Sequence, residues 1–368
     1  MDSSLKSLQN YLREEHIDLA YIDSPSSIAY FTHYISEPME RILALIVTPD
    51  HSLLFTPALE VIDAKKVTTT DTVIGYHDEE NPWQLMLDWS KGVHADSPQR
   101  VGVDKNSLTV LRQEALDNIW SPEFFEHIGS QIDQMRLIKT PDEIEKLHEA
   151  GRIADKAVRI GMDALRVGIS EQEVVAAIEF EMKKMGVSEM SFPTIVLFGD
   201  HAASPHGEPG SRQLQENELV LFDLGVLYNG YASDMTRTVA FGQVSQELKD
   251  IYHLVLEAQT TAEKNAHIGM LAKDLDLTAR DIISDAGYGE YFNHRLGHGI
   301  GQTAHEYPSL HSQNTQELLE GMCFSIEPGI YIEDKVGVRI EDCYVLTENG
   351  VESFTHTPKD WTELPIKY

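Results

Sequence analysis

The chain has 368 residues, of which 42% are hydrophobic and 24% are charged, as in a globular protein with room for two domains. Its 29 lysines and arginines are outnumbered by 60 acidic residues, so the formal net charge is −31 at pH 7. Nucleic acids and anionic membrane surfaces both require a basic patch. We therefore expect neither among the partners, and small molecules, peptides or cations instead.

The N-terminus is a charged amphipathic segment without the features of a secretory signal, and the longest apolar runs have the length of strands. We therefore expect a cytoplasmic protein with no membrane span. Cys323 and Cys343 do not form a Cys-x-x-Cys spacing. They are expected to be two buried free thiols.

Residues 1–128 are predicted to form an α/β domain, because short apolar strands alternate with helical patterns. Leucines at helical spacing predict a first helix over residues 4–15. The expected strands are residues 19–22, 42–47, 53–55, 73–76 and 101–103, and the expected helices lie near 58–65, 83–91 and 108–118.

Residues 129–368 are predicted to form an α+β domain made of two similar halves. Two capping boxes, Thr140-Pro-Asp-Glu143 and Ser170-Glu-Gln-Glu173, indicate where its first two helices begin. The four long helices are expected at residues 141–165, 171–185, 246–266 and 271–286. Each pair of helices precedes strands that carry two acids, which suggests an internal duplication.

In the first half, two acids share one face of a predicted hairpin. Its strands are expected at residues 219–224 and 231–240, and Asn229-Gly230 between them is typical of a tight two-residue turn. This register places Asp223 opposite Thr236 and makes Asp223 and Asp234 diagonal neighbours, roughly 7–8 Å apart at the backbone. Unless both acids point to solvent, their repulsion calls for a bound cation.

In the second half, Glu327 and Glu341 lie at equal distances from Asp334, so a hairpin turning at Asp334 would bring them face to face. Between the two pairs of acids lies Gly297-His-Gly-Ile-Gly301, whose glycines leave the His298 imidazole accessible. A glycine-rich loop or one histidine is weak evidence alone. Its position between four acids makes His298 a candidate ligand.

Asp223, Asp234, His298, Glu327 and Glu341 together make four carboxylates and one imidazole. Around one divalent ion, four carboxylates would leave about two uncompensated negative charges, whereas two ions balance them and can share a bridging hydroxide. Oxygen-rich ligation with one nitrogen suits Mn(II), with Co(II) or Zn(II) as substitutes by affinity order. We therefore predict two divalent ions, with Mn(II) as the first choice.

This ordered set resembles the metal site of the pita-bread metallopeptidases, which include methionine aminopeptidases, Xaa-Pro aminopeptidases and Xaa-Pro dipeptidases (prolidases). The motifs that carry the resemblance are Asp223…Asp234 followed by Thr236-Arg-Thr238, Gly297-His-Gly-Ile-Gly301, Ile326-Glu-Pro-Gly329 and Val338-Arg-Ile-Glu-Asp342. The first domain resembles a creatinase-type N-terminal domain, and the second a pita-bread domain with pseudo-twofold halves. Length and motifs are most similar to those of short bacterial Xaa-Pro dipeptidases.

The resemblance implies further catalytic residues at Glu327, His305, His206, His294 and Arg339. Glu327 is expected to act as the general base while remaining a ligand. His305 and His206 are expected to stabilise the oxyanion or hold the substrate. Arg339 lies two residues before Glu341, on the same strand face, where it can clamp the ligating carboxylates.

The resemblance also implies a homodimer that hydrolyses Xaa-Pro dipeptides at the bond before a C-terminal proline. A dipeptidase must bind the free carboxylate after proline, and Arg295 and Arg41 are the candidates. Arg41 would reach the site from a neighbouring subunit or across the domain interface.

Three other functions are compatible with this site or this fold. An Xaa-Pro aminopeptidase acting on longer peptides would use the same metal site. A metal-free creatinase-like amidinohydrolase or a non-catalytic binding module would use the same fold, but the intact set of five ligands argues against both. Hydrolysis of phosphotriesters, a side activity of prolidases as a family, is compatible with a two-metal hydroxide site.

Overall fold

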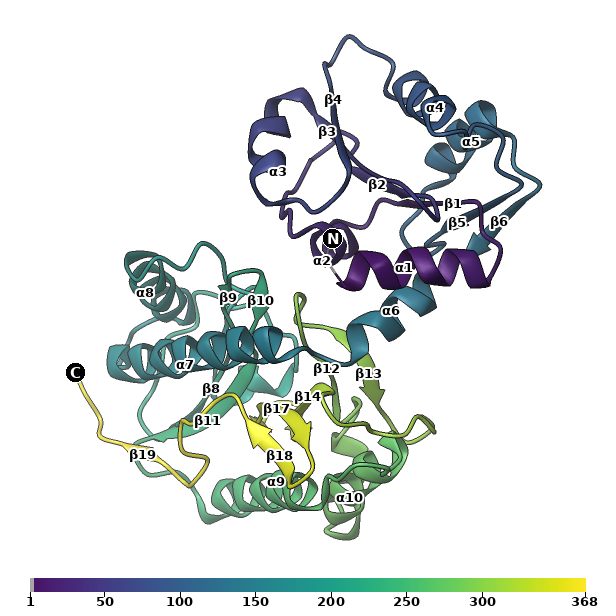
Figure 1. The fold of residues 1–368 in the computed structure, drawn as a ribbon. Helices are drawn as coiled ribbons and strands as arrows, with labels where there is room; N and C mark the ends of the chain where they lie inside the picture. Colours follow the sequence, from purple (N-terminus) through teal and green to yellow (C-terminus); the bar gives the residue numbers. More distant parts are fainter. Residues whose placement is uncertain (1–2) are drawn as a thin grey trace. The chain divides into compact units, whose positions relative to one another are not determined.

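The computed structural model describes residues 3–368, which form two compact units (Figure 1). The first unit extends to Arg136, and the second covers Leu137–Tyr368. Helix α6 (Gly129–Leu137) packs with the first unit, because Ile132 lies in its core. The division therefore falls near the end of this helix, whereas the sequence placed it at the beginning.

A six-stranded sheet forms the middle layer of the first unit, in the order β4-β3-β2-β1-β5-β6. The β1/β2 and β2/β3 pairs are antiparallel, and the other neighbours are parallel. The strands are β1 (Leu19–Ile22), β2 (Ala44–Val47), β3 (Ser52–Pro57), β4 (Thr72–Tyr76), β5 (Arg100–Val103) and β6 (Phe124–His127).

Helices cover both faces of this sheet, as expected for an α/β domain. One face packs against α1 (Ser3–Glu14), α2 (Pro25–Thr32), α3 (Val61–Val67) and α6, and the other against α4 (Pro82–Gly92) and α5 (Val110–Trp120). The 3-10 helix η1 (Ala58–Glu60) precedes α3. The sequence missed α2, which is buried on most sides and so lacks a polar face, and β6, a short, largely exposed edge strand.

Two helix pairs organise the second unit: α7 (Pro141–Ala164) with α8 (Glu171–Lys184), and α9 (Gln246–Asn265) with α10 (Ala272–Asp285). Both predicted capping boxes are present. In each, the hydroxyl of Thr140 or Ser170 accepts a hydrogen bond from the backbone three residues later, and the glutamate there accepts one in return. The four helices begin and end within two residues of the predicted positions.

Each helix pair packs on its own sheet, α7 and α8 on β19-β11-β8-β7 and α9 and α10 on β13-β12-β14-β17-β18. The two predicted halves are thus present. The strands are β7 (Ile195–Phe198), β8 (Glu218–Leu224), β9 (Leu227–Tyr228), β10 (Tyr231–Ala232), β11 (Met235–Phe241), β12 (Gly297–Gly299), β13 (Glu306–Leu310), β14 (Cys323–Ile326), β15 (Gly329–Ile332), β16 (Val336–Arg339), β17 (Asp342–Thr347), β18 (Gly350–Ser353) and β19 (Glu363–Leu364), and the 3-10 helices are η2 (Gly199–Ala203) and η3 (Gly289–Tyr291).

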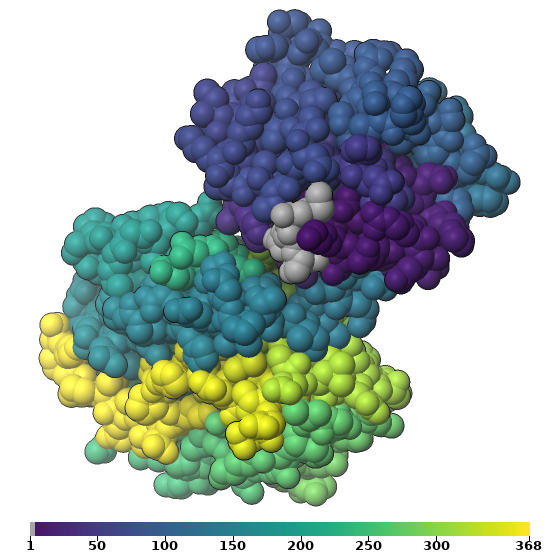
Figure 2. All heavy atoms as spheres, in the orientation of Figure 1, coloured from purple at the N-terminus to yellow at the C-terminus, as the bar shows by residue number. Residues whose placement is uncertain are grey.

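The C-terminal segment lies along helix α7, where its yellow atoms in Figure 2 adjoin the blue-green atoms of the helix. The backbone N–H groups of His356 and Thr357 donate to the carboxylate of Asp155 in α7. Cys323 and Cys343 are buried and free, as predicted. Within residues 3–368, no helix has the length and apolar character needed to cross a membrane.

Candidate metal centre

The hairpin that carries Asp223 and Asp234 has the predicted register. Tyr228 pairs with Tyr231 across the Asn229-Gly230 turn, and both turn residues have positive φ, 48° and 78°. Further along, Thr236 pairs with Asp223 in the ladder between β8 and β11. The turn chemistry therefore determines which side chains of the two strands share a face.

The hairpin is not one continuous ladder, because it breaks on both strands between the β8/β11 and β9/β10 pairs. At the break the backbone of Gly225 approaches Ser233 so closely that a Cβ would lie 1.7 Å from the Ser233 carbonyl oxygen. The Ser233 hydroxyl accepts a hydrogen bond from Val226 N at 2.9 Å and so satisfies one group freed by the break. Asp234 follows this irregularity directly and is 4% exposed.

The second hairpin, β15 and β16, turns at Asp334 as predicted, with Asp334 at φ 57°. Its register places Glu327 and Glu341 just beyond the paired residues. Glu341 also joins the first hairpin. Its N–H donates to the Thr236 carbonyl at 3.1 Å, and its Oε2 accepts from the Thr236 hydroxyl at 2.7 Å. The two hairpins are thus held together at a ligand residue.

The five predicted ligands come together in the structure. Their ligand atoms, with one from His305, form three groups whose members lie within 4.8 Å of one another: Asp223, Asp234 and Glu341; His298, Glu327 and Glu341; and Asp234, His298 and His305. Glu341 belongs to two groups and could contact two ions. His298 Nε2 lies 3.1 Å from Glu327 Oε1 and 3.5 Å from Asp234 Oδ2.

Buried oxygens without donors show that this cluster suits a cation. Asp223 Oδ1, Asp234 Oδ1 and Glu341 Oε1 are buried and have no hydrogen-bond partner among the described residues. Leaving one such group unsatisfied costs about 1–3 kcal/mol, and more when it is charged. Three of them in one cluster, together with an imidazole, fit divalent metal ions.

Burial raises the pKa values of three of the acids. For Asp234 the charges of Glu341 and Asp223 raise the pKa further, and for Glu341 those of Glu327 and Asp223 do so. Glu327 behaves differently. Burial raises its pKa, but the hydrogen bond and charge of His298, together with the charges of His294 and Arg339, outweigh burial and lower the pKa to about 2. Divalent cations would stabilise the ionised form of all four.

Arg339 lies against the acids, as the sequence analysis expected. Its guanidinium forms an ion pair with Asp223, and its Nε donates to the Thr236 hydroxyl at 3.0 Å. Nη1 donates to the Tyr331 hydroxyl at 2.7 Å, and that hydroxyl lies 3.0 Å from His294 Nε2. Tyr331 therefore connects Arg339 with His294.

Two hydroxyl residues of the centre were missed by the sequence analysis, Tyr331 and Ser325. The Ser325 hydroxyl donates to Glu327 Oε1 at 3.0 Å and accepts from His298 N at 3.0 Å. Strand periodicity offered a signal for both, because each is an even number of residues from Glu327 along the strands and is expected on the same face.

His305 and His206 are both exposed. The His305 ring centroid lies 4.1 Å from that of His298. Although the His305 side chain as a whole is exposed, neighbouring groups desolvate its ring; this, with the charge of His298, lowers the pKa of His305 to about 4, and the charge of His206 also lowers it. His305 is therefore neutral at pH 7.

The two arginines expected to bind the substrate carboxylate have partners in the structure. Arg295 is half-buried, and its Nη1 donates to the Ser309 hydroxyl at 3.1 Å. Arg41 belongs to the first unit, where it binds Asp78 through two hydrogen bonds of 2.8 and 3.0 Å. Both assignments stay predictions.

Comparison with known proteins identifies the class. Residues 145–348 match the model of metallopeptidase family M24, and residues 5–138 match the creatinase/prolidase N-terminal domain. The chain therefore belongs to metallopeptidase family M24 and is a metal-dependent peptidase with a creatinase-type N-terminal domain.

Individual relatives match nearly the whole chain. The Xaa-Pro dipeptidase of Lactobacillus helveticus is 47% identical over 367 residues, which are 99% of this chain and 100% of the relative. The prolidase from Pyrococcus horikoshii OT3 is 34% identical with a TM-score of 0.90, covering 98% of this chain and 99% of that one. The X-Pro aminopeptidase from Thermotoga maritima MSB8 is 30% identical with a TM-score of 0.86, covering 96% and 100%.

Proposed function

We propose that the protein is an Xaa-Pro dipeptidase (prolidase), which hydrolyses the peptide bond before a C-terminal proline. The observation that carries this proposal is the convergence of all five predicted ligands in a chain that is 47% identical, end to end, to an Xaa-Pro dipeptidase. The proposed substrates are Xaa-Pro dipeptides. The homodimer and the cytoplasmic location expected from the sequence remain predictions.

The proposed centre holds two divalent ions, with Mn(II) the first choice and Co(II) or Zn(II) as substitutes. Asp223 and Asp234 would hold one ion and His298 and Glu327 the other, with Glu341 shared between them. When bound, the ions supply a water of lowered pKa and polarise the scissile carbonyl.

Glu327 is the proposed general base. Its side chain is 15% exposed, against 12% for Asp223 and 6% for Asp234, so it is the more accessible to water and substrate. The Ser325 hydroxyl and His298 Nε2 contact the same oxygen, Oε1, and orient the carboxylate. If Glu327→Gln retained metal and full turnover, this assignment would be wrong.

His305 and His206 are proposed to stabilise the oxyanion or hold the substrate, because both are exposed, His305 lies beside the ligand His298, and His206 is close enough to His305 for its charge to lower the pKa of His305. A neutral His305 can donate one N–H to the carbonyl oxygen under attack. Arg339 and His294 are proposed to act together through Tyr331, with Arg339 fixing the Asp223 carboxylate.

Arg295 and Arg41 are the proposed readers of the substrate carboxylate. Replacing the responsible arginine with alanine is expected to raise KM for Ala-Pro and to spare an amidated analogue, which lacks that carboxylate. Equal losses on both substrates would remove the residue from this role.

A panel of peptides tests the proposed function. Protein stripped with a chelator and reloaded with Mn(II) is given Ala-Pro, Ala-Pro-Ala and Ala-Ala. Metal-dependent cleavage confined to Ala-Pro is expected. Efficient cleavage of the tripeptide would instead assign an Xaa-Pro aminopeptidase, a candidate favoured by the Thermotoga maritima structure with its TM-score of 0.86. Cleavage of neither proline peptide would refute both.

A further inference from the structure

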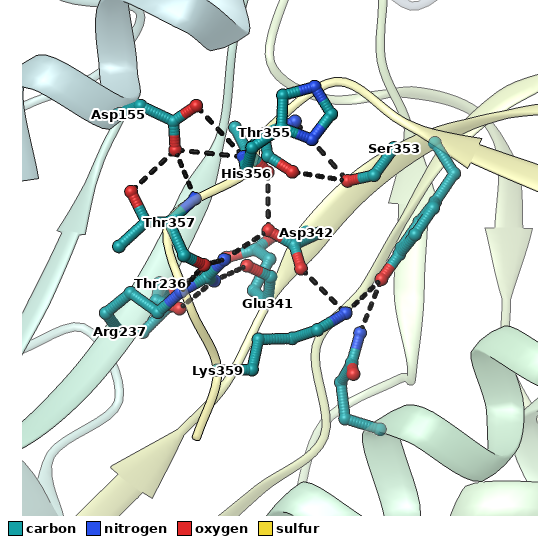
Figure 3. A network of polar contacts seen from close by, with 12 residues as sticks. Asp155, Thr236, Arg237, Glu341, Asp342, Ser353, Thr355, His356, Thr357 and Lys359 are labelled. Carbon is teal, nitrogen blue, oxygen red and sulfur yellow. Dashed lines mark hydrogen bonds and ion pairs between the residues drawn. The ribbon is translucent and has the colours of Figure 1, made fainter. Parts of the chain in front are cut away.

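A buried arginine, Arg237, lies beside Thr236, Glu341 and Asp342 in a network of polar contacts (Figure 3). Arg237 is 1% exposed. It follows Thr236 in β11, so its side chain leaves the opposite face of the strand. Nη1 donates to the carbonyls of Thr236 and Glu341, Nη2 to Asp342 Oδ1 and to the Thr357 carbonyl, and Nε again to Thr357. A guanidinium has five N–H groups, and this one uses all five.

The two carbonyls that share Nη1 belong to the residues that join the hairpins. Glu341 N donates to the Thr236 carbonyl, and on the other face the Thr236 hydroxyl bonds the Glu341 carboxylate. One guanidinium nitrogen therefore holds both main chains at the point where the ligand Glu341 enters the cluster. A shift of Arg237 would move Glu341 relative to the acids of the first hairpin.

The guanidinium is itself held by Asp342. The Asp342 side chain is 2% exposed and lies 2.6 Å from Arg237 Nη2. Its Oδ1 also accepts from the Thr355 hydroxyl, and its Oδ2 lies 2.9 Å from Lys359 Nζ. Lys359 in turn contacts Glu263 at 2.6 Å.

These charges balance. Two cations, Arg237 and Lys359, face two carboxylates, Asp342 and Glu263. These four groups together carry no net charge. We therefore expect Arg237 to act on the centre through geometry.

Residues 355–359 complete the network from the C-terminal segment (Figure 3). They are anchored to helix α7, where Asp155 accepts from the backbone of His356 and from the backbone and hydroxyl of Thr357 at 2.6–3.0 Å. The Thr357 carbonyl, which accepts from Arg237, is thus anchored to helix α7.

We infer that Arg237 is a positioning residue for the metal centre: held by Asp342 and by residues 355–359, it fixes the main chain of Thr236 and Glu341 so that the Glu341 carboxylate is placed for metal binding. The inference rests on the proposed metal centre and is independent of proline specificity.

Two variants of Arg237 separate geometry from charge. Arg237→Lys keeps the charge, but its three donors on one atom cannot span both carbonyls and Asp342. Arg237→Gln removes a positive charge near the acids, so an electrostatic role would make cations bind more tightly. We expect both variants to weaken Mn(II) binding about 10–100-fold, the usual effect of removing an outer partner of a ligand. The Kd is measured by competition with a fluorescent chelator on stripped protein shown to be folded by circular dichroism.

Arg112→Lys is the matched control. Arg112 pairs with the buried Asp23 at 2.7 Å in the first unit, which contains none of the five ligands. Its Mn(II) affinity should equal that of the wild type even if its Tm falls. The inference is overturned if the Arg237 variants bind Mn(II) like the wild type, if Arg237→Gln binds more tightly, or if Arg112→Lys weakens binding equally.

Asp342→Asn provides a second test of the inference if the Arg237 variants do not fold. It loosens the hold on the guanidinium and is expected to weaken Mn(II) binding, so wild-type affinity would contradict the inference. Wild-type protein that binds no Mn(II), Co(II) or Zn(II) would refute the metal centre itself, an outcome distinct from failure of the Arg237 assignment.

Discussion

Glu341 and Asp342 are consecutive buried acids on opposite faces of the same chain segment, and their surroundings differ. Asp342 has a cation or a hydroxyl at both carboxylate oxygens, supplied by Arg237, Thr355 and Lys359. Glu341 receives one hydroxyl at Oε2, and its Oε1 has no donor among the described residues. A buried acid whose partners are complete stabilises the fold, whereas one left incomplete marks a site that a ligand completes.

The largest expected effect is a loss of catalytic activity when Glu341, the incomplete acid, is replaced. Glu341→Gln removes the shared ligand and should lower kcat/KM for Ala-Pro on the order of 10³-fold in Mn(II), because several kcal/mol of metal-assisted stabilisation is lost. Steady-state kinetics on protein with verified metal content measures this. Activity within tenfold of the wild type would show that Glu341 is not a ligand.

For stability, the order of the two substitutions should be reversed: Asp342→Asn should have the larger effect. Asp342→Asn leaves the buried Arg237 guanidinium without a carboxylate, whereas Lys359 keeps Glu263, and it is expected to lower the free energy of unfolding by about 3–5 kcal/mol. Glu341→Gln removes a charge from a repulsive cluster and should not destabilise the metal-free protein. Urea unfolding of both variants after chelator treatment gives the comparison. Equal destabilisation by the two substitutions would contradict the proposed difference.

Metal removal should lower the thermal stability of the wild type more than that of a variant in which an incomplete acid, Glu341, has been replaced. Ions bound only to the folded protein stabilise it by about 2.7 kcal/mol per site at a free concentration 100 times Kd. Stripped wild-type protein is therefore expected to have a lower Tm than protein in Mn(II), whereas Glu341→Gln should show a smaller difference. A thermal scan with and without Mn(II) tests this, and an unchanged wild-type Tm would speak against the ions.

The smallest expected effect comes from removing the one hydroxyl that donates to Glu341, that of Thr236. Thr236→Val removes the donor to Glu341 Oε2 and the acceptor of Arg339 Nε. Losing a hydrogen bond to a charged group costs about 1.5–3 kcal/mol, so Mn(II) affinity should fall roughly 10–100-fold. Thr236→Ser keeps the hydroxyl and is the control. If Thr236→Val and Thr236→Ser bind Mn(II) with equal affinity, the proposed role of the hydroxyl is wrong.

Local patterns predicted much of the centre from the sequence. Asn229-Gly230 determined the register of the first hairpin, and the equal distances of Glu327 and Glu341 from Asp334 located the second turn. Both inferences needed only turn chemistry and alternation of side chains. Four of the five expected ligands lie on or beside these hairpins, and all five appear together in the structure.

Other features depend on distant partners and had no local signal. Strand alternation puts Arg237 behind the acids, but its partner Thr357 lies 120 residues further along the chain. The proximity of His305 to the ligands follows from the loop after β12, which no periodicity describes. Similarly, the pairing of Arg41 with Asp78 depends on how two loops of the first unit meet.

The central claim is that two hairpins assemble a two-ion centre that hydrolyses Xaa-Pro bonds. The most direct test titrates Mn(II) into stripped protein and measures bound Mn(II) and Ala-Pro hydrolysis in the same samples. We predict that hydrolysis rises with bound metal and reaches its plateau near two ions per chain. Full hydrolysis by the stripped protein, or two bound ions without hydrolysis of Ala-Pro, would contradict the claim.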